Sequence, residues 1–75
     1  MTPKPPLLSG RELIKIFIKK LGYEKISQKG SHIKIKNYET GSVAIIPDHK
    51  ELDRWTLKNI LKQTEISEEV IKKYL

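Results

Sequence analysis

The chain contains no cysteine, few aromatic residues and no long hydrophobic run. Without cysteine, disulfide frameworks, thiolate zinc sites and cysteine nucleophiles are all excluded. The longest apolar run, Val43 to Ile46, is too short for a membrane span or the core of a signal peptide. We therefore expect a cytoplasmic protein with no membrane partner.

Acidic residues are scarce in the first half of the chain. Residues 1–36 hold nine Lys and Arg against two acids (+7), whereas residues 37–75 hold six against seven (−1), which sums to the net charge of +6. A basic half on a small domain points to a polyanionic partner, of which nucleic acid is the first candidate. The alternative explanation is that the lysines only keep the protein soluble.

The length of 75 residues predicts a single small domain. Residues 1–8 carry three of the four prolines and predict an extended lead-in. We place the folded domain at residues 9–75. This length leaves no room for a cofactor-binding sheet beside a substrate domain, and we expect no cofactor.

The first regular element is predicted to be a helix. Ser9 and Glu12 have the spacing of a capping box, and Gly22 supplies a stop signal at the other end. The apolar residues between them fall in one arc of the helical wheel, with Ile16 outside it. They are Leu13, Ile14, Phe17, Ile18 and Leu21.

Three strands and two helices are predicted to follow. Residues 23–28 form a weak strand candidate, 32–36 alternate cleanly around Ile33 and Ile35, and 42–46 end at Pro47. Asp53 and Ser67 are placed to cap the two helices. The order α-β-β-β-α-α predicts an α+β domain in which helices cover one face of a three-stranded antiparallel sheet.

The exposed face of that sheet carries the one cluster with chemical content. The turn at Gly30 and Ser31 places His32 at the start of a strand, and three lysines lie nearby: Lys29, Lys34 and Lys36. An imidazole transfers protons near neutral pH, and ammonium groups hold a phosphate. The alternative is an ordinary surface histidine, which is the commoner case for such a residue.

Several motifs, in order, resemble the HicA family of toxin mRNA interferases. They are Ser9-Gly10-Arg11-Glu12-Leu13-Ile14, Leu21-Gly22-Tyr23-Glu24, Lys29-Gly30-Ser31-His32, Pro47-Asp48-His49 and the helical stretch from Thr56 to Gln63. The resemblance covers roughly residues 9–72, and the ordered set is more specific than any single motif.

This resemblance implies a double-stranded-RNA-binding-like fold and metal-independent cleavage of RNA. The essential histidine of the family's Gly-Ser-His motif corresponds to His32, and Gly30 and Ser31 shape its presentation. The resemblance also implies a HicB-like antitoxin as a protein partner that covers this region. No metal site is expected, because His32, Asp48 and His49 lack the spacing of a ligand set.

The chain departs from the family pattern at Trp55, where the family usually has glycine before Thr-Leu. Trp55 is interpreted either as a contact for RNA or antitoxin, or as core packed over the edge of the sheet. The core interpretation is favoured, because large aromatic residues are scarce in a small domain.

Other candidates carry alternative interpretations. His49 is a second acid/base, an RNA contact or a loop residue that bonds locally to the backbone. Lys15 and Lys19 on the first helix line an RNA path or form a solvated helix face, with Arg11 and Lys20 beside them.

The leading hypothesis is therefore a metal-independent endoribonuclease toxin that uses His32 for proton transfer during 2′-hydroxyl attack on phosphate. The alternative is a non-catalytic module of the same fold that binds structured RNA. DNA binding by the last two helices is disfavoured, because Glu68 and Glu69 would face phosphate.

Overall fold

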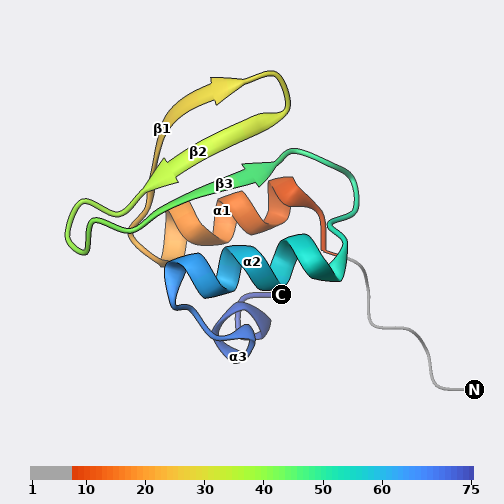
Figure 1. Ribbon diagram of the computed structural model, residues 1–75. Coiled ribbons are helices and arrows are strands. Elements are labelled where there is room, and N and C mark those ends of the chain that lie inside the picture. The colour runs from red at the N-terminus through yellow and green to blue at the C-terminus, as the bar shows by residue number, and fades with distance from the viewer. Residues whose placement is uncertain (1–7) are drawn as a thin grey trace, which may run out of the picture.

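The computed structural model describes residues 8–75 as a three-stranded sheet with all helices on one side (Figure 1). The strands are antiparallel in the order β1-β2-β3. The expected α+β class and element order are confirmed. The elements are α1 (Gly10–Lys20), β1 (Glu24–Lys29), β2 (His32–Lys36), β3 (Val43–Pro47), α2 (Arg54–Thr64) and α3 (Glu68–Lys72).

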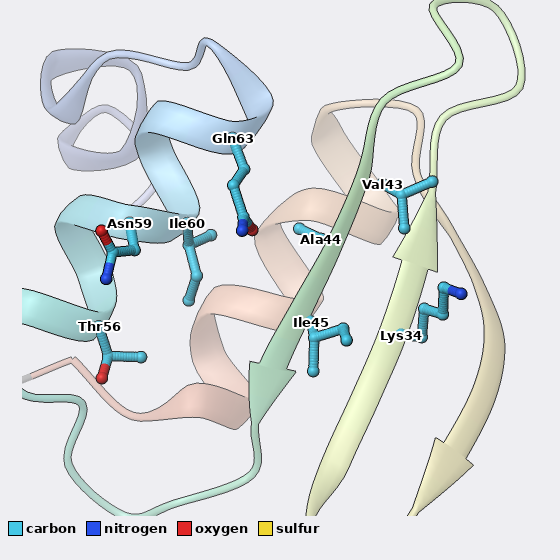
Figure 2. Close-up of a pocket in the computed structure, with 8 residues that line it drawn as sticks. All are labelled: Lys34, Val43, Ala44, Ile45, Thr56, Asn59, Ile60 and Gln63. Carbon is cyan, nitrogen blue, oxygen red and sulfur yellow. The ribbon is translucent and has the colours of Figure 1, made fainter.

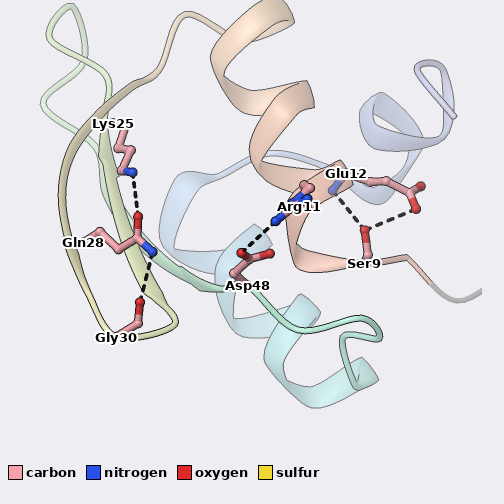
Figure 3. Close-up of polar contacts among 7 residues, drawn as sticks. All are labelled: Ser9, Arg11, Glu12, Lys25, Gln28, Gly30 and Asp48. Atoms are coloured by element: carbon pink, nitrogen blue, oxygen red, sulfur yellow. Dashed lines mark hydrogen bonds and ion pairs between the residues drawn. The ribbon is translucent and has the colours of Figure 1, made fainter.

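The start of α1 is fixed by its cap, as predicted. The hydroxyl of Ser9 accepts a hydrogen bond from the backbone N–H of Glu12 at 3.0 Å (Figure 3). The carboxylate of Glu12 accepts from the same hydroxyl at 3.2 Å, where a full capping box would have it bind a backbone amide. The Ser9 cap is therefore present, but the expected bond from a backbone N–H to the Glu12 carboxylate is replaced by one from the Ser9 hydroxyl.

The burial of α1 differs from the predicted arc at two positions. Ile16 is buried, whereas Ile18 is 38% exposed. Lys20 lies one turn after Ile16, and its Nζ is 5.9 Å from the centroid of the Tyr74 ring beyond α3. Ile16 belongs to the same buried cluster as Ile71 of α3, so α1 is buried over a wider arc than the sequence predicts.

The strands pair in the expected meander. Gly30 has a φ of +59°, and Lys29 pairs with His32 across the two-residue turn. Ile33 and Ile35 are buried in β2, opposite Ile46 and Ala44 of β3. The core of the domain lies between these alternate side chains and the helices.

Tyr23 is a core residue that the sequence pattern did not place. Its ring packs edge-to-face against Phe17, with 4.9 Å between centroids, and its hydroxyl donates to Oγ of Ser42 at 2.9 Å. By contrast, every residue of β1 after it is exposed. The weak alternation in β1 thus reflects a strand that lies at the edge of the core.

The caps of the last two helices are confirmed. Asp53 caps α2 and Ser67 caps α3, where its hydroxyl accepts from Val70 N–H at 3.3 Å. Ile60 and Ile71 are buried in the same core as α1. Leu57, Leu61 and Ile66 pack partly buried against it.

The predicted lead-in falls mostly on residues 1–7, which lie outside the described part of the chain. Leu8, its last residue, is buried, and its carbonyl accepts from Leu52 N–H at 2.8 Å. Leu8 therefore belongs to the folded core. Between residues 8 and 75, no helix combines the length and apolar character that crossing a bilayer requires.

Candidate functional site

The strand register shows which side chains lie on the face of the sheet opposite the helices. His32 pairs with Lys29 and Pro47, and Lys34 pairs with Ser27 and Ile45. Residues directly opposite one another in antiparallel strands point to the same side. We call this side the open face, and it carries Glu24, Ser27, Lys29, His32, Lys34, Lys36, Val43, Ile45 and Pro47.

A hollow of about 440 Å³ lies on the open face around His32. We call it the sheet hollow, and it is lined by Ser27, Lys29, His32, Lys34 and Ile45. One histidine and two lysines are among the five residues that line the sheet hollow, and none of the five is acidic. Such a set can transfer a proton beside a phosphate whose charge the lysines neutralise.

The backbone around His32 is held by side-chain bonds in the turn before it. Nε2 of Gln28 donates to the carbonyl of Gly30 at 3.0 Å, and Nζ of Lys25 donates to Oε1 of Gln28 at 2.6 Å (Figure 3). On the other side, the carbonyl of Ser31 accepts from Asp48 N–H at 2.7 Å. These bonds fix where β2 begins and therefore where His32 sits.

The loop after β3 is anchored to the first turn of α1. The guanidinium of Arg11 lies 3.5 Å from the carboxylate of Asp48 (Figure 3). Gly10 N–H donates to the His49 carbonyl at 2.9 Å. The side chain of His49 is exposed and does not line the sheet hollow. The sheet hollow is therefore lined by His32 and not by His49, whose carbonyl makes a backbone contact with α1.

The predicted RNA-binding lysines separate into different regions. Lys29 and Lys34 line the sheet hollow. Lys36 shares the open face, but it is about 13 Å farther along β2 from His32, and its Nζ is 5.0 Å from the centroid of the Tyr38 ring. Lys15 and Lys19 are exposed on α1, which packs against the opposite face of the sheet.

Trp55 lies in the first turn of α2 and is 75% exposed. The prediction that it packs as core is therefore wrong. The apolar stripe of α2 that contains Ile60 faces the core, and Trp55 lies off that stripe. Lys58 and Lys62 follow three and seven residues later, so Trp55 shares its helix face with two cations.

Two residues of the sheet hollow were not singled out from the sequence. The two-residue turn at Gly30 and Ser31 sets Ser27 opposite Lys34, so the register alone would have found Ser27. Ile45 follows from the alternation in β3, where Ala44 and Ile46 face the core. Ser27 and Ile45 can be assigned to one hollow only once the pairing of the strands is known.

Within residues 8–75, no group of three or more His, Cys, Asp or Glu side chains is placed to hold a metal ion.

Comparison with known proteins identifies one family. The model described as HicA toxin of bacterial toxin-antitoxin matches residues 10–66 of the 75. This stretch contains α1, the whole sheet and α2, and hence every residue of the sheet hollow. A search of curated proteins finds no match to the chain.

Proposed function

The chain belongs to the HicA toxin family of toxin–antitoxin systems, and we propose that it is an mRNA interferase that cleaves RNA in the sheet hollow. The observation that carries the proposal is the placement of His32 between Lys29 and Lys34 in one hollow of the open face. This is where a phosphodiester would find both a proton acceptor and positive charge.

In the proposed reaction, His32 accepts the proton of a ribose 2′-hydroxyl. The freed oxygen attacks the adjacent phosphorus, and the bond from phosphorus to the 5′ oxygen of the next nucleotide breaks. The products are a 2′,3′-cyclic phosphate and a 5′-hydroxyl. The proton that the leaving oxygen needs comes from water or from an ammonium group of the hollow, because His49 lies outside the hollow's lining.

The lysines of the sheet hollow are proposed to stabilise the charge that develops on the phosphate. Lys29 lies opposite His32, and Lys34 lies two residues along the same face. Preorganised charge of this kind lowers the barrier because it needs no rearrangement during the reaction. Lys36 is proposed to hold a neighbouring phosphate, and Lys15 and Lys19 to contact RNA that continues around α1.

Membership of the family implies an antitoxin, and we propose that a HicB-like protein covers the open face. The net charge of +6 suits a partner with acidic groups at the interface. Trp55 is proposed as a contact for RNA or for this antitoxin, since its exposed ring suits either. The cytoplasm, where mRNA and antitoxin are found together, is the proposed place of action.

The test is cleavage of a purified transcript in the presence of chelator, with protein prepared free of antitoxin. The parent should cleave, whereas His32→Ala should lose activity by about a hundredfold or more. His49→Ala is the matched control, because it makes the same change at the other histidine and should retain cleavage. RNA binding without cleavage by the parent would instead support the non-catalytic binding module.

A further inference from the structure

A second hollow adjoins the sheet hollow, between the edge strand β3 and α2 (Figure 2). Its volume is about 430 Å³, within the range of about 300–1,000 Å³ typical of small-ligand sites. We call it the edge groove, and it is lined by Lys34, Val43, Ala44, Ile45, Thr56, Asn59, Ile60 and Gln63. Lys34 and Ile45 line both hollows, so the two are adjacent.

The two walls of the edge groove differ in chemistry. The β3 wall is apolar, with Val43, Ala44 and Ile45. The α2 wall presents Ile60 together with neutral hydrogen-bonding side chains at Thr56, Asn59 and Gln63. Their spacing of three and four residues places them in a row along one side of the helix. Figure 2 shows the amide of Gln63 extending toward β3.

The charge of the edge groove also differs from that of the sheet hollow. Lys34 is the one charged residue among its eight lining residues, and it lies at the junction with the sheet hollow. A chain of phosphates therefore finds little attraction inside the groove. A nucleobase suits it better, because a base has apolar faces and a polar edge, and side-chain amides offer both a donor and an acceptor.

We propose that the edge groove is a base-binding subsite that selects where RNA is cleaved. With the scissile phosphate held by Lys29 and Lys34, the base of an adjacent nucleotide enters the groove. Its faces pack against Ile45 and its polar edge bonds to Asn59 and Gln63. This inference rests on the proposed ribonuclease function, and it makes Asn59 and Gln63 specificity-determining residues.

An extended peptide from a protein partner is the competing occupant, because edge strands can pair with an added strand. β3 offers little room for such pairing, since it has five residues and ends at Pro47, which lacks an N–H. The two hollows share Lys34 and Ile45, and this adjacency further favours RNA, because a nucleotide next to the scissile phosphate is within reach of the groove.

The test compares parent, Asn59→Ala and Gln63→Ala for binding to short oligoribonucleotides that differ at one base. Alanine is a strong helix former and both positions are exposed, so α2 should persist. Each substitution should reduce the ratio of affinities between the best and worst base by about tenfold. Lys58→Ala, on α2 but outside the groove, should weaken all sequences alike.

The proposal is overturned if the parent shows no base preference. It is equally overturned if Asn59→Ala and Gln63→Ala both keep the parent's ratio of affinities between the best and worst base. It is also overturned if the variants lose affinity for an antitoxin while their base preference is unchanged. Cleavage is measured separately on the same proteins. A parent that never cleaves, yet has a base preference that the variants lose, would overturn the ribonuclease function and still support the subsite.

Discussion

At the scale of single residues, His32 is placed by the backbone of the turn before it. Gly30 adopts a positive φ of +59°, which residues with a Cβ rarely adopt. The bonds from Gln28 to Gly30 and from Asp48 to Ser31 then hold the start of β2 in place. The histidine itself stays exposed and free to meet substrate. Its position therefore depends on neighbours that take no part in the chemistry.

Near this site, the backbone of Gly10 at the start of α1 lies close to the end of β3. A Cβ at Gly10 would overlap the carbonyl of Pro47, the residue that pairs with His32. We predict that Gly10→Ala destabilises the fold by about 1–3 kcal/mol, as overpacking does. Urea unfolding followed by circular dichroism measures the change.

The control for this prediction is Lys15→Ala in the same helix. Lys15 is exposed, and such surface changes stay within about 0.5 kcal/mol. If Gly10→Ala were as stable as this control, the close packing of α1 against the end of β3 would be contradicted.

The sequence was least informative at residues whose burial depends on distant segments. Tyr23 is buried because Phe17 and Ser42 come to it from other elements. Trp55 is exposed because α2 turns Ile60 rather than the indole toward the core. The burial of Tyr23 cannot be read from local periodicity, whereas the periodicity of α2 already sets Trp55 off its apolar stripe.

At the scale of elements, the helix caps connect sequence most directly to stability. The carboxylate of Asp53 accepts from Thr56 N–H at 2.7 Å and from the Thr56 hydroxyl at 3.0 Å. The backbone bond is the larger cause, and together they hold the pKa of Asp53 below its ordinary value of 3.8. The cap of α2 therefore depends on an ionised carboxylate.

This lowered pKa predicts a pH dependence. Because the folded state binds the Asp53 proton less tightly than the unfolded state, the cap's contribution is present above about pH 4 and is lost as pH falls below the ordinary pKa. Asp53→Asn keeps a capping side chain but has no titrating group. We predict that it loses less stability than the parent between pH 7 and about pH 3, as measured by urea midpoints.

Ser67→Ala is the matched control for the pH series. It removes the α3 cap and should cost about 1 kcal/mol at either pH, because no charge is involved. An equal loss on acidification in Asp53→Asn and in the parent would contradict the role given to the Asp53 carboxylate.

The helix α3 lies beyond the matched residues 10–66, yet it completes the core. Ile71 is 2% exposed and belongs to the same cluster as Ile16. We predict that Ile71→Ala costs about 2–5 kcal/mol, as other buried large-to-small substitutions do. Thermal or urea unfolding measures it.

Leu75→Ala, at a residue 63% exposed, is the control and should be nearly neutral. If both variants unfold at the same denaturant concentration, α3 does not belong to the cooperative core.

Most of the elements could be predicted from the sequence. The Ser9, Asp53 and Ser67 caps and the alternation of β2 each carry a local signal that packing did not override. The burial of Ile16 had no such signal, because it lies outside the predicted arc of α1 and belongs to a cluster that includes Ile71 of α3. The full buried surface of α1 can be recognised only once the tertiary structure is known.

At the scale of the whole molecule, the fold divides positive charge between two sides. Lys29, Lys34 and Lys36 occupy the open face, whereas Lys15 and Lys19 lie on α1 beyond the sheet. The total charge was evident from composition, but its division required the structure. The sequence likewise predicted Lys29 and Lys34 correctly as neighbours of His32, whereas Lys36 lies farther along β2. It missed the edge groove, which is formed by segments far apart in the chain.

The charge on the open face predicts how RNA affinity responds to salt. Each lysine that neutralises a phosphate releases a counterion, so Lys29→Gln or Lys34→Gln should each reduce the slope of log affinity against log salt by about 0.7 for single-stranded RNA. Lys72→Gln on α3, among the helices that cover the other side of the sheet, should leave the slope unchanged. Equal slopes for all three variants would contradict RNA binding in the sheet hollow.

The central claim is that His32 activates a ribose 2′-hydroxyl, and the most direct measurement removes that hydroxyl from the substrate. An RNA that the parent cleaves at one site is compared with the same RNA carrying a single 2′-deoxynucleotide on the 5′ side of that bond. We predict that the modified RNA is not cut there and that the all-ribose product ends in a 2′,3′-cyclic phosphate. Cleavage at the deoxynucleotide would contradict the mechanism.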